Sequence, residues 1–348
     1  MSAAAIPART PRSGLRALLS RQPEWAVAAL ALGLMLVIGA VNPAFWEPAN
    51  LFSLLRANVV TGILALGVLL VMLSGGIDVS FPAFAIAAMY LTIKGMIAVG
   101  YDGVVLPFVV ATLIGLGLGL LNAVFVHGLR MIPLIVTLGT GTAVRGLLLG
   151  GVSASQINID EMPQRLIAFA NTQLLTIGSG DGHVGLSAMV LVYLLIAAGV
   201  HLLLRHTLAG RGIYALGGGE EPALRAGFSV RNTRLLIYGL AGALAGFAGL
   251  LHGSMIWVAN PRDMAGSEID VIAAVVLGGA SIFGGRGSVA GTMLGVFTFV
   301  LLTNSLIIMH IDTTWQRVVV GLVVVGAAGI TAWRDQRRQR GAGRGVGS

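Results

Sequence analysis

The feature that most constrains this chain is a succession of long apolar blocks that carry very little charge. Most of them run for about 17 to 25 residues, the length a helix needs to cross about 30 Å of hydrocarbon. The apolar residues are continuous and do not alternate with polar ones, which is typical of helices and not of membrane barrel strands. The sequence predicts an all-α polytopic membrane protein with about ten transmembrane helices, at residues 25–41, 51–73, 80–99, 104–126, 132–150, 186–205, 234–257, 268–283, 288–309 and 315–333.

The eighth block, residues 268–283, is short for a span, so a tilted, broken or buried helix is expected there. The first block follows several arginines, as a signal peptide does. It is long for the apolar part of a signal peptide and nine blocks follow it, so a retained helix is predicted.

The 22 Lys and Arg residues predict the orientation, because cytoplasmic ends of spans are enriched in them. Acidic residues gather on the opposite side, at Asp102, Asp160, Glu161, Asp181, Asp263 and Asp312. Both termini are therefore predicted to be cytoplasmic, and the net charge of +8 predicts contact with anionic lipid, not with nucleic acid. The basic residues assigned to the inner side are Arg9, Arg12, Arg16, Arg21, Arg130, Arg205, Arg211, Arg225, Arg231, Arg234, Arg286, Arg334, Arg337, Arg338, Arg340 and Arg344.

The chain reads as one membrane domain between two basic tails. Two connections between blocks are long, and the others are short. The predicted units are a cytoplasmic tail at 1–24, a transmembrane domain at 25–333 and a second cytoplasmic tail at 334–348, with a periplasmic segment at 151–185 and a cytoplasmic loop at 206–233.

Glycines recur at four-residue spacing inside the blocks, which lets helix backbones approach closely. We expect these glycines to pack helices within one chain. An interface between two subunits is the alternative. The sets are Gly115/Gly119, Gly146/Gly150, Gly242/Gly246 and Gly287/Gly291/Gly295.

Several kinds of chemistry are missing from the sequence. Lys94 is the only lysine and does not stand in a phosphate-binding loop of the form G-x-x-x-x-G-K-[ST], so ATP hydrolysis by that route is excluded. There is no cysteine, the histidines do not form H-E-x-x-H, and no Ser, His and acid stand in a recognisable catalytic context. We expect no enzyme activity, no metal and no cofactor.

One short charged stretch inside the long inner loop predicts a helix of about two turns. Gly219 can cap it, Glu220 and Glu221 suit its positive end, and Pro222 is tolerated in a first turn. Arg225 lies near the negative end and Gly227 suits the stop. Because so short a helix is marginal on its own, something else must hold it.

A second stretch, Ser74-Gly-Gly-Ile-Asp-Val-Ser80, predicts a break between two spans. Paired glycines followed by Pro82 free backbone groups, which is tolerated at membrane depth only inside protein or beside a water-filled cavity. Asp78 either caps the following helix, which is favoured, or lines a pathway. Asn122 and Asn304 are expected to bridge helices, and charged residues near outer ends of spans either snorkel or dock a partner: Arg145, Glu268, Asp270 and Arg317.

Four stretches, in this order, resemble one family. They are SGGIDVS (74–80), IPLIVTLGTGTAVRGL (132–147), GRGIYALGGGEEPALRAGFSVRNTRLLIYGLAGALAG (210–246) and EIDVIAAVVLGGASIFGGRGSVAGTMLG (268–295). The sequence is similar to ribose-type permeases of ABC importers, from the simple-sugar and branched-chain amino acid group. The resemblance extends over about residues 50–333.

The resemblance implies a short coupling helix that docks on a separate ATPase subunit, with the residues Glu220, Glu221, Ala223, Leu224, Arg225 and Gly227. A translocation pathway or broken helix is expected at Gly75, Gly76, Asp78, Ser80, Thr137 and Thr140. The implied location is the bacterial inner membrane, and the implied partners are the ATPase, a periplasmic binding protein and a second permease subunit, identical or not.

The implied solute is a monosaccharide or a similar small polar molecule. Branched-chain amino acids, nucleosides and a signalling furanose stay open within the family, and an ion-coupled secondary transporter stays open outside it. The family usually has Asn and Ala where this chain has Gly219 and Pro222, and it has small residues where Phe81-Pro82-Ala83 stands.

Overall fold

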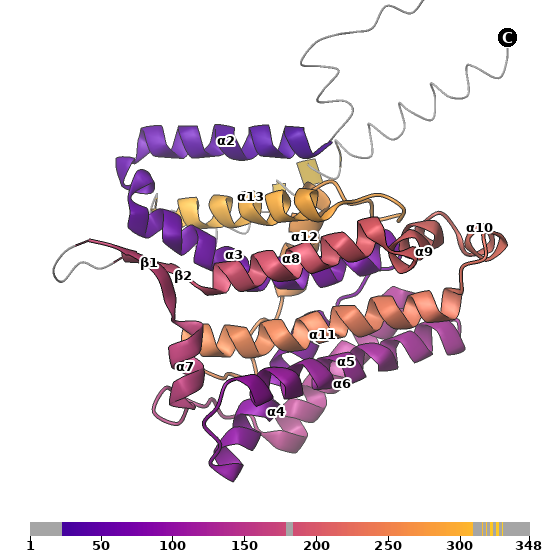
Figure 1. Ribbon diagram of the computed structural model, residues 1–348, viewed down its shortest axis with the longest axis horizontal. Coiled ribbons are helices and arrows are strands. Elements are labelled where there is room, and N and C mark those ends of the chain that lie inside the picture. Colours follow the sequence, from indigo (N-terminus) through magenta and orange to yellow (C-terminus); the bar gives the residue numbers. More distant parts are fainter. Residues whose placement is uncertain are drawn as a thin grey trace, which may run out of the picture.

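The computed structural model is a bundle of roughly parallel and antiparallel helices (Figure 1). It describes residues 23–178, 184–308 and isolated helical positions between 315 and 329. Within these residues, eight helices are long and apolar enough to cross a membrane, which confirms the predicted fold class. Several predicted segments lie outside the described part: the tail at 334–348, nearly all of the tail at 1–24, most of the predicted tenth span, and residues 179–183. Asp181, Asp312 and Arg317 lie outside it as well.

The eight long helices match the first nine predicted blocks without the eighth, with ends shifted by a few residues. Prolines in the first turn mark the starts of α3, α4 and α6, where a missing backbone N–H costs nothing. The 3₁₀ turn η1 (Pro43–Trp46) joins the first two helices, and the π-helical turn η2 (Leu148–Val152) extends α6. The long helices are α2 (Pro23–Val41), α3 (Pro48–Leu73), α4 (Phe81–Val99), α5 (Val105–Gly128), α6 (Pro133–Leu147), α8 (Met189–His206), α11 (Val230–Ile256) and α13 (Val289–Ile308).

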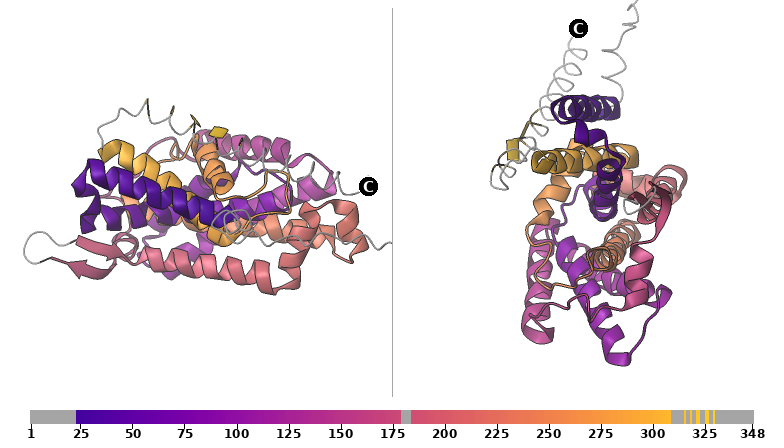
Figure 2. Two further views of the ribbon diagram at one scale, coloured as in Figure 1. Left: turned by 90° about the horizontal axis from the view of Figure 1, so that it is seen from above. Right: turned by 90° about the vertical axis from the view of Figure 1, so that its left-hand side faces the viewer.

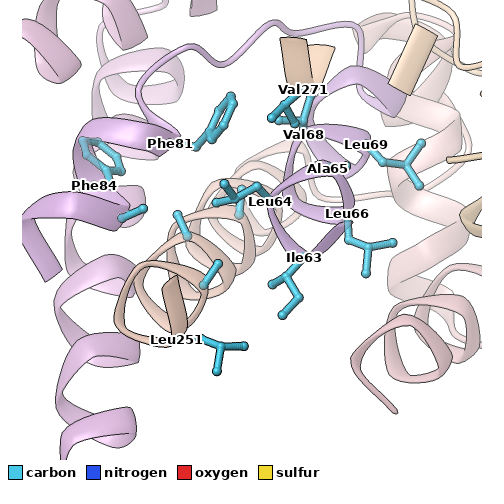
Figure 3. Packing of buried hydrophobic residues seen from close by; sticks show 14 of the residues in the cluster. Ile63, Leu64, Ala65, Leu66, Val68, Leu69, Phe81, Phe84, Leu251 and Val271 are labelled. Atoms are coloured by element: carbon cyan, nitrogen blue, oxygen red, sulfur yellow. The ribbon is translucent and has the colours of Figure 1, made fainter. Parts of the chain in front are cut away.

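Helix α3 forms the centre of the core. Every residue from Gly62 to Leu73 is buried, so this half of the helix has neighbours on all sides. Figure 3 shows its side chains beside Phe81 and Phe84 of α4, Leu251 of α11 and Val271 of α12. By contrast, α2 lies at one edge of the bundle, where it packs on α13, as the right-hand view of Figure 2 also shows. Its exposed apolar face is available to lipid.

The glycines on α5 and α11 pack directly against one another. A Cβ atom added at Gly115 would lie 2.1 Å from the carbonyl oxygen of Gly242, and one added at Gly246 would lie 2.1 Å from that of Ala111. The predicted packing within one chain is thus confirmed for Gly115/Gly119 with Gly242/Gly246. Gly291 and Gly295 likewise pack on the end of α12, whereas Gly146 and Gly150 have no atom within 4 Å of an added Cβ.

At the eighth block, a short buried helix is present, as expected, and it does not make a full crossing. The helix there, α12 (Ser267–Leu277), has 11 residues, about half the length that a bilayer requires. Residues 278–288 form turns instead, with left-handed backbone at Gly279, Gly284 and Gly285. The side chains of Val271, Ala274 and Val275 are buried in the bundle, so the apolar run reflects contact with protein and not with lipid.

Small elements cover the two ends of the bundle and lie opposite each other in Figure 1. At one end, within the predicted outer segment, α7 (Gln164–Ala170) precedes an antiparallel hairpin of β1 (Gln173–Ile177) and β2 (Val184–Ser187). At the other end lie α9 (Leu208–Gly217) and α10 (Glu220–Arg225). Following the charge-based orientation, we call them the outer end and the inner end. Helix α7, the hairpin and α9 were not predicted from the sequence.

Candidate functional site

Helix α9 fastens the inner loop to the bundle. Thr207 caps it, because its hydroxyl accepts a hydrogen bond of 3.0 Å from the backbone N–H of Gly210. Gly217 lies so close to α3 that an added Cβ would be 1.9 Å from the carbonyl oxygen of Leu73. Tyr214 donates a 2.9 Å hydrogen bond to the carbonyl of Gly287. The loop is therefore seated on the inner end of α3 and on the turns after α12.

Helix α10 follows after Gly218 and Gly219, and its six residues agree with the predicted length of about two turns. Gly227, at φ +84°, donates to the carbonyl of Leu224 at 2.9 Å, and Phe228 donates to that of Ala223 at 3.0 Å. This pair of bonds is a Schellman motif, in which glycine supplies the left-handed residue that ends a helix. The predicted stop at Gly227 is confirmed.

The six residues predicted for coupling do not all face outward. Ala223 is buried, and the Glu220 carboxylate bonds to the Arg234 guanidinium at 2.8 Å. Glu221 pairs with Arg225 one turn later, with both side chains about three-quarters exposed, and Leu224 is 54% exposed. The outward surface of α10 therefore consists of an apolar side chain beside an exposed ion pair.

The predicted break between α3 and α4 is present, and Gly76, Asp78 and Ser80 within it are buried. Gly75 takes a left-handed conformation at φ +82°, and residues 76–80 after it form no regular secondary structure. The Asp78 carboxylate accepts hydrogen bonds from the backbone N–H of Ser80 at 2.7 Å and from its hydroxyl at 2.6 Å. Ser80 is itself the residue that precedes α4, so Asp78 shapes the approach to the helix and does not cap its first-turn amides.

Asn122 of α5 joins the broken segment to α6. Its side-chain amide donates to the Ser80 hydroxyl at 2.9 Å, and its carbonyl accepts from the Thr140 hydroxyl at 2.7 Å. The Thr137 hydroxyl accepts from the backbone N–H of Val79 at 3.3 Å. We call Asp78, Ser80, Asn122, Thr137 and Thr140 the buried polar cluster. Its side chains bond to one another or, in the case of Thr137, to the backbone of the broken segment, which favours a role in holding three elements together.

Of the predicted pathway residues, the structure brings together Asp78, Ser80, Thr137 and Thr140, and it places Gly75 and Gly76 just before them. The predicted bridging role of Asn122 is confirmed, but its central position in the cluster was missed. An asparagine within an apolar block was the available signal, since such a residue needs a partner.

Hydrogen bonds and ion pairs also cross between elements at the outer end. Arg56 of α3 donates to the Asn171 side chain at 2.7 Å and to the carbonyl of Met255 at 2.8 Å. Arg145 lies 3.5 Å from Glu268, so this pair joins α6 to α12. His252 lies 2.8 Å from Asp263 in the loop after α11, and this hydrogen bond holds the pKa of the Asp263 carboxyl below its usual range despite the opposing effect of burial.

We expect Asp263→Asn to lower stability by about 1 kcal/mol at neutral pH, since the carboxylate is partly exposed and the bond is screened. The pKa of Asp263 is lowered in the folded chain, so this contribution is full above the usual carboxyl range and is lost as the pH falls through the lowered value. Melting temperatures of the purified protein at pH 7 and below about pH 4 test this, because the difference from the parent should shrink in acid. Asp160→Asn, at an exposed acid for which the described structure shows no ion pair, is the control.

The fold and these contacts define a polytopic α-helical membrane protein, with a largely buried break near the inner end and a helical loop exposed there. The family model described as the branched-chain amino acid transport system / permease component matches residues 50–328. The chain belongs to this family, and it is a multi-pass protein of the inner membrane. Such a permease is a transport component and not an enzyme, and importers of this class in general include ATPase and binding-protein subunits.

Named relatives resemble the chain over most of its length. The ribose import permease protein of Bacillus subtilis is 36% identical over 292 residues, which cover 84% of this chain and 87% of the relative. The ribose import permease protein of Escherichia coli is 30% identical over 299 residues, covering 84% and 89%. The xylose transport system permease protein of Escherichia coli is 28% identical over 390 aligned residues, covering 97% of each chain. No solved structure matches the chain.

Proposed function

We propose that this chain is the membrane-spanning subunit of an ATP-driven importer that moves a monosaccharide or a similar small polar solute. The observation that carries the proposal is the near full-length similarity to permeases named for ribose and for xylose. The substrates in those names belong to the relatives, so the solute of this chain is what the experiment below has to identify.

The partners in this proposal follow from what the chain contains and lacks. Its single lysine does not stand in a phosphate-binding loop, so ATP is hydrolysed on a separate ATPase subunit. The outward surface of α10, with Leu224 between Glu221 and Arg225, is the proposed contact with that subunit. A second permease subunit completes the pathway, and a periplasmic binding protein delivers the solute to the outer end.

There are two kinds of alternative to this proposal: another solute within the same family, and a transporter of a different class. The description of the matching family favours branched-chain amino acids as an alternative solute, and nucleosides or a signalling furanose are further candidates within the group. An ion-coupled transporter would need ionisable groups in the pathway. Asp78, in the break near the inner end of the bundle, is the acid that could play this part. Its carboxylate already accepts hydrogen bonds from the backbone N–H and the hydroxyl of Ser80, which gives that alternative little support.

The test is solute uptake by the complete complex in proteoliposomes. The chain is purified together with its co-purifying partners and reconstituted, with ATP supplied on the side of α10 and binding protein on the opposite side. We expect ATP-dependent uptake of a radiolabelled pentose or hexose, and no uptake of leucine. Leucine uptake without sugar uptake would contradict the proposed solute, and uptake driven by an ion gradient without ATP would contradict the proposed class.

A further inference from the structure

Glu220, the first residue of α10, has a side chain that is 51% exposed but is paired with the protein's own helix bundle. Its carboxylate bonds to Arg234, in the second turn of α11, at 2.8 Å. The Arg234 side chain is only 20% exposed, and its other terminal nitrogen lies 3.5 Å from Nδ1 of His127 near the end of α5. One guanidinium thus joins three helices at the inner end, and its partner on α10 is one of the residues predicted to contact the ATPase.

We infer that Arg234 is a positioning residue that transmits displacement of α10 to the helix pair α5–α11, and that Glu220 serves this link instead of docking. The inference rests on the proposed function, because it assumes that a partner moves α10. It assigns the two neighbouring glutamates different tasks: Glu221 belongs to the exposed surface, whereas Glu220 ties that surface to the membrane domain.

The two helices that Arg234 reaches are packed so closely that they move as one body. An added Cβ at Gly119 would lie 2.1 Å from the carbonyl oxygen of Tyr238, and one at Gly242 would lie 2.2 Å from that of Gly115. Backbone in contact with backbone leaves no room for one helix to slide or rotate alone, since packed interiors are not continuously deformable. Force applied at Arg234 on α11 is therefore shared with α5.

The α5 helix carries this displacement to the buried polar cluster. Asn122 is five positions before His127 on α5 and bonds to both Ser80 and Thr140. A shift of α5 along or across the bundle must therefore move the broken segment and α6 with it, or break these bonds. The proposed route runs from Glu220 to Arg234, through the α5–α11 pair, to Asn122.

A second connection from α10 competes with this route. Through α9, Gly217 touches the end of α3, and Gly285 donates to the Leu73 carbonyl at 2.9 Å. That contact is made at the end of α3, just before the broken segment, and it does not involve Arg234. The two routes differ in one respect that can be measured, because only the first depends on a charge pair that can be inverted.

The experiment reverses the pair in the complete reconstituted complex and measures solute molecules transported per ATP hydrolysed. In Arg234→Glu, two carboxylates face each other, and we expect this ratio to fall about tenfold, within the range that residues on a coupling route contribute. The combined variant Glu220→Arg with Arg234→Glu restores an opposite pair and should recover most of the ratio. Arg231→Glu makes the same charge change at an exposed position one turn earlier on α11, and it should leave the ratio unchanged.

Binding of the ATPase subunit is measured in parallel and should be retained in all three variants. A parental ratio in Arg234→Glu, or failure of the combined variant to recover the loss, would overturn the inference and favour the α9 route. The parent complex separates this result from the proposed function. If the parent takes up none of the sugars, the proposed function has failed, whereas uptake by the parent with an unaffected variant refutes only the role of Arg234.

Discussion

Gly119→Val is expected to prevent the chain from accumulating as a stable folded protein. The new Cβ would lie 2.1 Å from the carbonyl oxygen of Tyr238 and 3.1 Å from the Cα of Gly242. Both atoms belong to the backbone of α11, so the clash cannot be relieved by a rotamer change and the helices must separate. Overpacking of a core costs about 1–3 kcal/mol even where side chains can adjust, and we expect a larger loss here.

Gly117→Val provides the matched control on the same helix. Gly117 is exposed, and no atom lies within 4 Å of an added Cβ. The same substitution two residues away should therefore leave membrane yield and melting temperature close to those of the parent. The measurements are the amount of monodisperse protein after extraction and its thermal unfolding in detergent. Equal behaviour of the two variants would show that α5 and α11 are not packed as the structure describes.

The sequence predicted the membrane helices well because a span is a local property. In the hydrocarbon of a membrane, the backbone N–H and C=O groups of a long apolar run must form hydrogen bonds within that run, as they do in a helix. A span can therefore be predicted without knowing which helices lie next to it. At α12, the length of the block predicted a tilted, broken or buried helix, but the sequence did not show which of these it is. The structure shows that α13 and neighbouring helices bury the apolar run, so it needs no full-length crossing. Composition alone does not separate a side chain that faces lipid from one that faces protein.

The candidate site was predicted in part. The residues that were identified act on their neighbours in the sequence, whereas those whose roles were missed act on residues far away in the sequence. The ends of α10 depend on Gly219 and Gly227, which act locally, and both were identified. Asn122 and Arg234 act on residues far away in the sequence: Asn122 is 42 positions from Ser80, and Arg234 is 107 positions from His127. Such contacts are fixed by how the helices pack, so the tasks of Glu220 and Glu221 could be separated only in the structure.

Leu224→Asp is expected to reduce transport strongly while leaving the membrane domain intact. Leu224 is 54% exposed on α10, between side chains that already pair with each other, so within the described chain little depends on it. Burial of a leucine in a partner's groove contributes about 1.5–3 kcal/mol, and an aspartate there would add the cost of an unpaired charge. We therefore expect binding of the ATPase subunit to weaken at least about tenfold, with transport lost in proportion.

Two further variants separate docking from a general effect of charge at the inner end. Leu224→Ala removes the apolar contact while keeping a good helix former, and it should weaken ATPase binding in the same direction but by less. Leu208→Asp places the same charge on an exposed leucine at the start of α9, and it should bind the ATPase as the parent does. Co-purification and solute uptake report both properties. Transport at the parental rate by Leu224→Asp, with the ATPase still bound, would mean that α10 is a connecting loop and that the docking surface lies elsewhere.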